Sequence, residues 1–312
     1  MHTLLIVSTH GDEYRELVEA ARLPQLVVAN GLLPDRTVAA AGACDLVLGE
    51  PALVRELLPH CPRLRWVQST WAGVEPLLDP ALRRDYVLTN ARGVFGSLVA
   101  EYVHAYMLAH ERRLLEKHAA QTARQWDPAP PGTLRGKQLG LIGVGSLGAA
   151  VARTAKHFGM RVKGYTRASS GCADVDAYYH GAERAAFAAG LDYLVITAPN
   201  TAGTRRLVDA ALLGALPAGA VIINAGRGAI VDEPALASAL SEGRISGAVL
   251  DVFDQEPLPA DHVFWRTPNT LITSHTAALS APAAIVPLFA DNYRRFLAGE
   301  PLRYQVDFAL GY

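Results

Sequence analysis

Several features that would assign a chain to a specialised class of protein are scarce in this sequence. It has three cysteines, Cys44, Cys61 and Cys172, and no two of them form a CxxC pair. This excludes a disulfide framework, fits a reducing cytoplasm and favours buried small apolar side chains. The 29 Lys and Arg residues balance the 30 Asp and Glu residues. Because there is no basic surplus, we expect no nucleic-acid partner.

Long apolar runs and metal-ligand spacings are missing as well. No apolar stretch reaches the length of about 18 residues that indicates a membrane span. Residues 1–14 lack a cationic leader, so we interpret their apolar run as a first strand and not as a signal peptide. His104, His110 and His118 stand 6 and 8 residues apart, which does not match the i,i+4 spacing of helical zinc ligands. We therefore expect a cytoplasmic protein with no metal site.

The sequence does contain a dinucleotide-binding pattern between residues 138 and 167. An apolar run leads into a glycine turn, a helical stretch follows, and a second apolar run ends at Tyr165. In such a unit the first glycine permits the tight turn, the second lets the backbone approach a pyrophosphate, and the third brings the helix close to the strand. The helix N-terminus favours the phosphate charge. The cofactor-binding residues expected at this turn are Gly143, Gly145, Ser146, Leu147 and Gly148.

Strand and helix patterns alternate through the rest of the chain. Short buried strands are expected over 4–8, 25–29, 45–48, 64–68, 192–197, 220–224, 248–250 and 271–273. This alternation predicts an α/β fold of parallel sheets covered by helices. Open α/β sheets bind ligands just after their strands, where this sequence has the 69–74 loop, Pro199, Ala225, Asp251 and His275. The 69–74 loop is either a cradle for a carboxylate or an ordinary turn.

Two long helices are expected in addition. Residues 99–117 form one continuous helical pattern with Ser97 as its N-cap, and 280–298 form the last helix, with Pro282 in its first turn. The first of these helices is apolar on more than one face, so it must be covered on more than one side. A proline-rich connector over 125–132 follows it.

Arg227, Glu256 and His275 form a set that suits the reduction of a 2-oxo acid. Arginine can hold a carboxylate through two parallel hydrogen bonds and polarise the neighbouring carbonyl. Histidine can donate a proton near neutral pH, and a carboxylate beside it favours the imidazolium form. His10 also follows a strand, but it lies outside the nucleotide-binding half, so we assign proton donation to His275. Each residue taken singly also fits a structural role.

Five segments make the chain resemble the D-isomer-specific 2-hydroxyacid dehydrogenases, and within them the glyoxylate/hydroxypyruvate reductase branch. They are QSTWAGVE at 68–75, GLIGVGSLG at 140–148, INAGRGAIVDEPAL at 223–236, LDVFDQEPLP at 250–259 and TSHTAALSAP at 273–282, and the closing QVDFALGY at 305–312 is similar to that branch too. The resemblance implies two Rossmann-like domains with the active site in the cleft between them. Residues 1–97 and 281–312 would form a flavodoxin-like substrate (catalytic) domain, and 98–280 the dinucleotide-binding domain.

The resemblance also implies residue roles. Arg227 would bind substrate, Glu256 would pair with His275 as the acid/base, and Asp251 would contact the nicotinamide amide. The 69–74 loop would meet the substrate carboxylate, which makes Trp71, Ala72, Gly73 and Arg227 the substrate-binding residues. The long helix over 99–117 would form most of a homodimer interface.

Two positions depart from the commonest pattern of that family. Thr166 and Arg167 follow the strand 161–165 where NAD-preferring members carry an acid. With Ser169 and Ser170 they suit a 2′-phosphate, so we expect a preference for NADPH, with NADH as an alternative cofactor. Trp71 places a large ring in a loop where many members have a small residue.

The expected activity is NAD(P)H-dependent reduction of a small 2-oxo acid, glyoxylate or hydroxypyruvate, to the D-2-hydroxy acid. Two alternatives stay open. One is reduction of a bulkier 2-oxo acid such as an arylpyruvate, on which the Trp71 ring would stack. The other is a nicotinamide-sensing binding protein of the corepressor type, which the loss of the Arg–Glu–His set or long added tails would favour.

Overall fold

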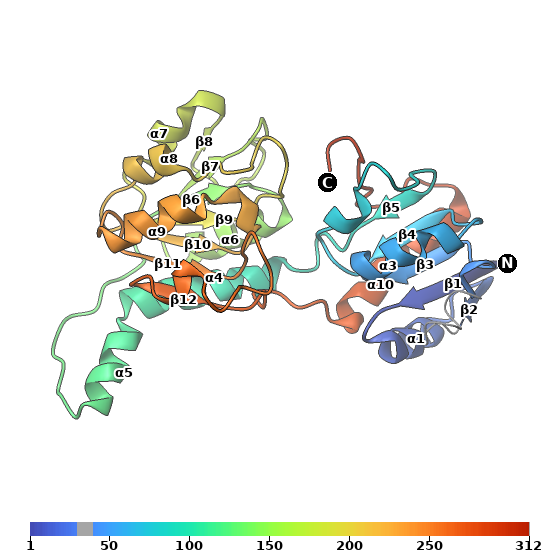
Figure 1. The fold of residues 1–312 in the computed structure, drawn as a ribbon, viewed down its shortest axis with the longest axis horizontal. Helices are drawn as coiled ribbons and strands as arrows, with labels where there is room; N and C mark the ends of the chain where they lie inside the picture. Colours follow the sequence, from blue (N-terminus) through green and yellow to red (C-terminus); the bar gives the residue numbers. More distant parts are fainter. Residues whose placement is uncertain (30–39, 312) are drawn as a thin grey trace. The chain divides into compact units, whose positions relative to one another are not determined.

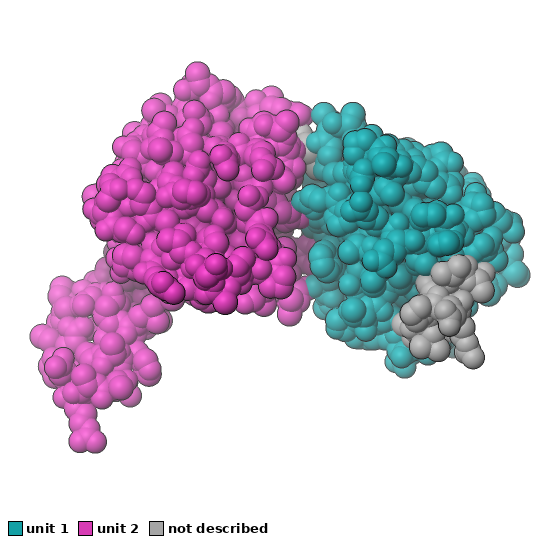
Figure 2. Space-filling model, in the orientation of Figure 1, with its two compact units in different colours: residues 1–94, 280–312 teal, residues 95–279 magenta. Residues whose placement is uncertain are grey.

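The structure, a computed structural model, describes residues 1–29 and 40–311. The chain divides into two compact units, which we call unit 1 (1–94 and 280–312) and unit 2 (95–279) (Figure 2). It enters unit 2 between Val94 and Phe95 and leaves it between Leu279 and Ser280. The sequence predicted hinges near residues 97 and 281. Both units are α/β with a parallel sheet, as the alternating strand and helix patterns predicted.

Unit 1 is built on a five-stranded parallel sheet in the order β2-β1-β3-β4-β5 (Figure 1). This is the flavodoxin-like order of doubly wound sheets. The strands are β1 (His2–Val7), β2 (Leu26–Ala29), β3 (Leu46–Gly49), β4 (Trp66–Ser69) and β5 (Val87–Thr89). The helical segments whose bounds lie within the described residues are α1 (Gly11–Ala20), α3 (Pro51–Leu57), α10 (Pro282–Ala298) and the 3-10 turns η1 (Leu58–His60) and η2 (Glu75–Leu77).

The two faces of this sheet have separate covers. Val54 of α3 belongs to the apolar cluster that includes Val47 and Val67 on one face. Trp66 stacks on Phe289 of α10, at 5.2 Å between ring centroids. Since side chains alternate between faces along a strand, Trp66 and Val67 face opposite layers. Burial of both faces explains why these strands read as continuous apolar runs in the sequence.

Unit 2 carries a seven-stranded parallel sheet in the order β12-β11-β10-β9-β6-β7-β8. The order reverses at β6, which pairs with β7 on one side and β9 on the other; this is the dinucleotide-binding arrangement with one added strand. The strands are β6 (Gln138–Ile142), β7 (Arg161–Tyr165), β8 (Ala177–Tyr179), β9 (Tyr193–Ile196), β10 (Val221–Asn224), β11 (Gly247–Leu250) and β12 (Thr270–Ile272).

Helices cover both faces of the seven-stranded sheet. Apolar residues of α4 (Gly96–Glu111) and α6 (Ser146–His157) share one core cluster, and those of α7 (Arg184–Ala188), α8 (Ala210–Ala215) and α9 (Glu233–Ser241) share the other. The 3-10 turns of this unit are η3 (Gly181–Glu183), η4 (Gly228–Ile230) and η5 (Val263–Trp265). Because all seven strands between these helical layers are parallel, their carboxyl ends lie along one edge of the sheet.

The prediction of one continuous helix over 99–117 is wrong. α4 ends at Glu111, and a second helix, α5 (Leu114–Thr122), starts after Arg113, whose φ is 53°. A residue in the left-handed region interrupts the helical hydrogen-bond ladder. The Arg113 guanidinium lies 3.3 Å from the carboxylate of Asp127 in the connector, a contact that helical periodicity cannot reveal. In Figure 1, α5 extends away from the sheet of unit 2.

The helix starts also differ from expectation. α4 begins at Gly96 with Phe95 as the N-cap residue and no side-chain cap, so Ser97 is not the cap. α10 begins at Pro282, in agreement with a proline in the first turn.

Within the described ranges, no helix combines the length and hydrophobicity needed to cross a membrane.

Two of the three cysteines are core residues, as their small apolar character predicted. Cys44 and Cys61 are buried in unit 1, with their Sγ atoms 4.0 Å apart, and Cys172 is half-buried in unit 2. The contact with the Cys61 sulfur raises the pKa of the Cys44 thiol, and burial adds to the rise. Cys44 therefore packs as a neutral apolar group.

Candidate active site

The glycine turn after β6 has the close packing that a dinucleotide site requires. Gly143 has a φ of 91°, and a Cβ on it would lie 2.7 Å from the Cα of Ala198. A Cβ on Gly148 would lie 2.2 Å from the carbonyl oxygen of Gly143. Gly145 is the N-cap residue of α6, which begins at Ser146. Only glycine fits at the first and third positions, and the turn leads directly into a helix N-terminus that suits a pyrophosphate.

The reversal of strand order brings further predicted cofactor residues to the same edge. β6 and β9 are neighbours, and the Thr197 hydroxyl after β9 donates to the Gly143 carbonyl at 2.8 Å. Pro199 lies exposed two residues farther on, and Ala225 follows the adjacent strand β10. In open α/β sheets the ligand crevice lies at this switch point. The residues present therefore fit a dinucleotide.

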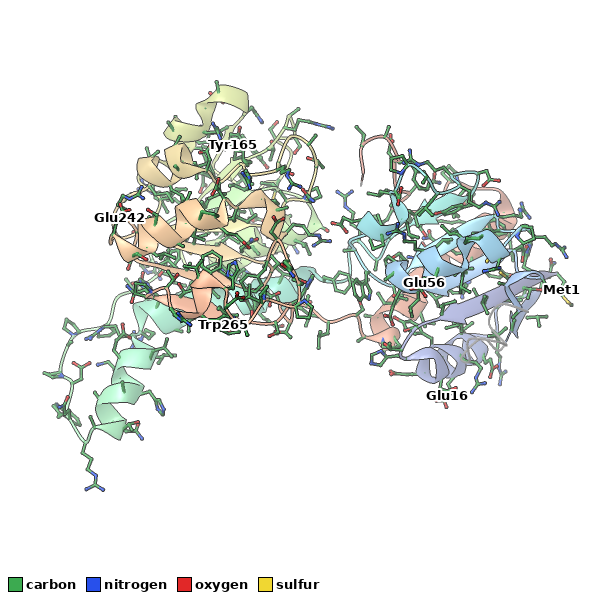
Figure 3. The ribbon with its side chains drawn as sticks, viewed as in Figure 1. Met1, Glu16, Glu56, Tyr165, Glu242 and Trp265 are labelled. Carbon is green, nitrogen blue, oxygen red and sulfur yellow. The ribbon has the colours of Figure 1, made fainter. Side chains whose placement is uncertain are left out.

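The loop after β7 is polar and carries no acid. Tyr165, labelled in Figure 3, is the last residue of this strand. Thr166 is buried, and its hydroxyl donates to the Ser169 carbonyl at 2.6 Å. Arg167 and Ser169 are exposed at the loop surface. A carboxylate for the ribose hydroxyls, which NAD-binding sites place near here, is not found between residues 166 and 173.

Arg227 is presented by a tight loop after β10. The Asn224 side chain accepts from the Gly226 N–H and donates to the Arg227 carbonyl, both at 3.1 Å. A Cβ on Gly228 would lie 1.8 Å from the carbonyl carbon of Phe253. The loop that carries Arg227 is therefore packed directly against the loop that carries Glu256, and this contact requires glycine.

Glu256 and His275 form a hydrogen-bonded pair from two different loops. His275 Nδ1 lies 2.7 Å from Glu256 Oε2, and Glu256 Oε1 accepts from the Phe253 N–H at 2.9 Å. His275 has a φ of 55°, a conformation that is uncommon outside glycine and that recurs at functional sites. Since a carboxylate accepts, Nδ1 carries the hydrogen and Nε2 is left for proton exchange.

The charges of this pair favour an ionised state. The hydrogen bond to Glu256 raises the pKa of His275 against partial burial, which acts to lower it. Burial acts to raise the pKa of Glu256, but the bonds from His275 and the Phe253 N–H outweigh it and the pKa is lowered. Arg227 lies near enough for its charge to act on both groups, lowering the pKa of Glu256 and opposing the rise at His275. The structure thus brings the three predicted catalytic residues together.

Asp251 has a structural role that the sequence did not indicate. It is buried, and its Oδ1 accepts from the Thr273 hydroxyl at 2.5 Å and the Thr276 N–H at 2.8 Å, while Oδ2 accepts from the Ala277 N–H at 3.0 Å. Its main-chain carbonyl accepts from the His275 N–H at 2.8 Å. Asp251 therefore anchors the loop that holds His275. Its expected contact with a nicotinamide amide stays a prediction.

Glu233 and His262 also support the site and were missed by sequence reasoning. Glu233 Oε1 accepts from the Asp254 N–H at 3.0 Å, and Oε2 lies 3.3 Å from His262 Nε2. Glu256 thus accepts from the Phe253 N–H, and Glu233 accepts from the next N–H along the chain, that of Asp254. The only signal in the sequence was an acid at the first helical position of α9, where it reads as an ordinary helix start.

Hydrogen bonds fix the backbone of the 69–74 loop in unit 1. Ser69 Oγ accepts from the Trp71 N–H and donates to the Trp71 carbonyl, which also accepts from the Ala91 N–H. The Asn90 amide donates to the Ala72 carbonyl at 3.0 Å. The Trp71 side chain is 45 % exposed. The loop therefore presents an accessible ring on a fixed backbone, and its contact with substrate, through Trp71, Ala72 and Gly73, stays a prediction.

His10, the competing proton donor, has a different environment. It follows β1, and its Nδ1 lies 3.2 Å from the Thr9 hydroxyl. This hydroxyl contact differs from the carboxylate contact of His275. The geometry therefore supports His275.

Comparison with known proteins gives one consistent result. Residues 104–277 match the model of the NAD-binding domain of D-isomer specific 2-hydroxyacid dehydrogenases. The chain is 34 % identical over 266 residues to glyoxylate/hydroxypyruvate reductase A of Serratia proteamaculans, an alignment that covers 82 % of this chain and 84 % of the relative.

Solved structures agree over nearly the full length. A D-isomer specific 2-hydroxyacid dehydrogenase family protein of Aeromonas salmonicida is 39 % identical with a TM-score of 0.94, covering 98 % of this chain and 99 % of that one. The NADPH-dependent glyoxylate/hydroxypyruvate reductase of Sinorhizobium meliloti, solved with NADP and sulfate, is 29 % identical with a TM-score of 0.90 and full coverage of both chains (100 %).

Proposed function

Given that this chain belongs to the D-isomer-specific 2-hydroxyacid dehydrogenase family and is an NAD(P)-dependent enzyme of it, we propose that it reduces glyoxylate or hydroxypyruvate to the D-2-hydroxy acid with NADPH. The observation that carries the proposal is the 2.7 Å pair of His275 and Glu256 beside the charge of Arg227. That set supplies a proton donor and a carboxylate anchor, the two groups that reduction of a 2-oxo acid needs from a protein.

Arg227, His275 and Glu256 have separate roles in the proposed reduction. Arg227 binds the substrate carboxylate through its guanidinium and polarises the adjacent carbonyl. A reduced nicotinamide cofactor, held by the glycine turn at Gly143 and the N-terminus of α6, would supply the hydride for the carbonyl carbon. His275 Nε2 gives its proton to the carbonyl oxygen, and Glu256 stabilises the imidazolium before the transfer and keeps the ring oriented. In the reverse direction, neutral His275 takes the proton back from the hydroxyl.

The preference for NADPH rests on the loop after β7. Arg167 follows the strand 19 residues after Gly148, close to the offset of about 20 residues at which NAD-binding sites place an acid. A guanidinium with neighbouring hydroxyls binds a phosphate, whereas a carboxylate would repel it. The reductase of Sinorhizobium meliloti, named as NADPH-dependent, supports the same proposal.

The role of the Trp71 ring distinguishes small 2-oxo acids from bulkier ones as the preferred substrates. If its half-exposed ring limits the space beyond the reacting carbon, small 2-oxo acids are preferred; the name of the Serratia proteamaculans relative supports this choice. If the ring instead stacks on an aromatic substrate, an arylpyruvate is preferred. The deciding experiment is a panel of glyoxylate, hydroxypyruvate, pyruvate and phenylpyruvate, each assayed with NADPH and NADH. The highest kcat/KM with phenylpyruvate, or no turnover of any 2-oxo acid, would contradict the proposal.

We further propose a homodimer. α5 has no residue buried within its own chain, and it exposes Leu114 and Leu115, while the connector exposes Trp126 at 93 %. Exposed apolar groups of this size on one projecting segment indicate an interface, and a second copy covers them by pairing like with like. Light scattering at micromolar protein should give twice the chain mass of 33.3 kDa. A mass of one chain would contradict the dimer.

A further inference from the structure

We propose that Tyr178 and His180, two side chains of the segment around β8, are positioning residues that select NADPH by holding the 166–172 loop in place. This inference rests on the proposed use of NADPH and goes further, because it concerns residues that are not themselves expected to touch the cofactor. The loop contains Arg167, Ser169 and Ser170, and β8 is the edge strand next to it in the sheet.

Tyr178 holds the C-terminal end of the loop, at Cys172, and we call this contact and that of His180 at the other end the two ties of the loop. Its hydroxyl oxygen accepts from the Cys172 N–H at 3.0 Å. Its ring lies over Gly164 of β7, where an added Cβ would be 3.1 Å from Tyr178 Cε1 and 2.9 Å from Val144 Cγ2. Val144 belongs to the glycine turn, so the Tyr178 ring and the pyrophosphate turn meet over the same glycine. The loop end is therefore fixed relative to the turn that would bind the rest of the cofactor.

His180 ties down the near end. Its Nδ1 lies 3.0 Å from the Thr166 carbonyl oxygen and 3.2 Å from the Thr166 hydroxyl. Because a carbonyl only accepts, Nδ1 carries the hydrogen and donates it. The Thr166 hydroxyl in turn donates to the Ser169 carbonyl at 2.6 Å. His180 therefore controls the direction in which the chain leaves β7 immediately before Arg167.

The two rings act as one support. Tyr178 and His180 are two residues apart on the strand path and stack with their planes 9° from parallel, at 6.4 Å between centroids. Tyr179, between them, points to the other face, where it packs against Phe187. The 166–172 loop is thus tied at both ends to one face of the edge strand, and residues 167–171 lie between the ties.

A loop fixed in this way favours one cofactor over the other. Ordering a free loop around a 2′-phosphate would reduce the binding free energy, and a loop that is already ordered avoids this loss. NADH has no 2′-phosphate and gains nothing from the order of Arg167 and its neighbours. Loss of either tie should therefore weaken NADPH binding and leave NADH binding nearly unchanged.

Tyr178→Phe is the direct test, since it removes the hydroxyl and keeps the ring. The Kd and KM for NADPH should rise about three- to tenfold, the effect of one hydrogen bond, with kcat and the KM for NADH nearly unchanged. Tyr179→Phe is the matched control on the same strand and should change neither cofactor. His180→Ala should act like Tyr178→Phe, and His180→Asn, which keeps a donor near the Nδ1 position, should recover part of the affinity.

The outcomes separate this inference from the proposed function. If Arg167→Ala lowers the preference for NADPH while Tyr178→Phe and His180→Ala leave it unchanged, the ties are not positioning elements and the inference fails alone. If Arg167→Ala also leaves the preference unchanged, the proposed role of Arg167 in cofactor choice fails with it; a wild-type enzyme that does not prefer NADPH would overturn the proposed cofactor itself. A rise in KM for both cofactors in variants that keep the wild-type Tm would likewise overturn the inference.

Discussion

Nδ1 of His275 lies 2.7 Å from Oε2 of Glu256, and the two residues come from loops that follow neighbouring strands of one sheet. The carboxylate raises the pKa of the imidazole and uses its Nδ1 hydrogen. Nε2 is thereby left for proton exchange, and in the proposed reduction the ring would enter as an acid.

The first prediction concerns this proton donor. His275→Ala should lower kcat for glyoxylate reduction by about 10²- to 10⁴-fold, the usual contribution of acid–base catalysis, with the Kd for the cofactor nearly intact. His10→Ala is the matched control and should keep the wild-type rate. If His275→Ala stays near the wild-type rate and His10→Ala does not, the donor has been assigned to the wrong histidine.

The second prediction concerns pH. Reduction needs the imidazolium, so its kcat/KM should fall as pH rises through the raised pKa of His275; oxidation needs the neutral ring and should rise over the same interval. Glu256→Gln removes the charge that raises the pKa, so both limbs should move to lower pH while much of the maximal rate remains. Profiles that do not move in either direction would show that Glu256 does not set this ionisation.

The third prediction concerns Arg227. Arg227→Ala should raise the KM for the 2-oxo acid and also lower kcat, since in the proposed reaction the guanidinium both binds the carboxylate and polarises the carbonyl. We expect a loss of about two orders of magnitude or more in kcat/KM, since each hydrogen bond to a charged group contributes about 1.5–3 kcal/mol. Arg227→Lys keeps the charge without the two-pronged geometry and should recover only part of it. A change in the KM for NADPH alone would place Arg227 at the cofactor instead.

The fourth prediction concerns the cofactor. Arg167→Ala should raise the KM for NADPH about tenfold or more, with little change for NADH, because one charged hydrogen-bond partner of the 2′-phosphate is lost. Arg161→Ala, at the opposite end of β7, is the control and should affect neither cofactor. Equal effects of Arg167→Ala on both cofactors would contradict the NADPH preference.

The fifth prediction concerns Trp71. Trp71→Ala should raise kcat/KM for phenylpyruvate relative to glyoxylate, since removal of the ring enlarges the space for the substrate. Trp71→Phe keeps an aromatic ring and should lie between the wild type and Trp71→Ala. A selective loss of phenylpyruvate turnover would instead favour the arylpyruvate alternative.

Local patterns were sufficient to predict much of this molecule. The glycine turn at Gly143 and Gly148 follows from a strand, a turn and a helix adjacent in sequence, and the parallel sheets covered by helices follow from the alternation of strand and helix patterns. The set of Arg227, Glu256 and His275 could be proposed because parallel strands end at one edge of a sheet, which brings residues far apart in the sequence together.

Contacts between distant segments could not be predicted in this way. The helix breaks at Arg113, whose guanidinium contacts Asp127 in the connector beyond the helix. The anchoring role of Asp251 depends on donors 22 to 26 residues later in the chain. β5 was not expected, and the C-terminal tail showed no turn signals, yet Val306 N–H donates to the Leu88 carbonyl at 2.8 Å. Each of these features requires knowledge of which segments meet, and hydrophobic periodicity does not contain it.

The division of the chain has a consequence for engineering and for divergence. Arg227, Glu256 and His275 all belong to residues 95–279, whereas Trp71 and its loop belong to residues 1–94. If the 69–74 loop contacts the substrate as proposed, random substitution of 70–74 should change the accepted substrate while the proposed proton donor and cofactor site stay constant. Libraries built there should yield variants that differ in which 2-oxo acid they accept and share a single pH profile.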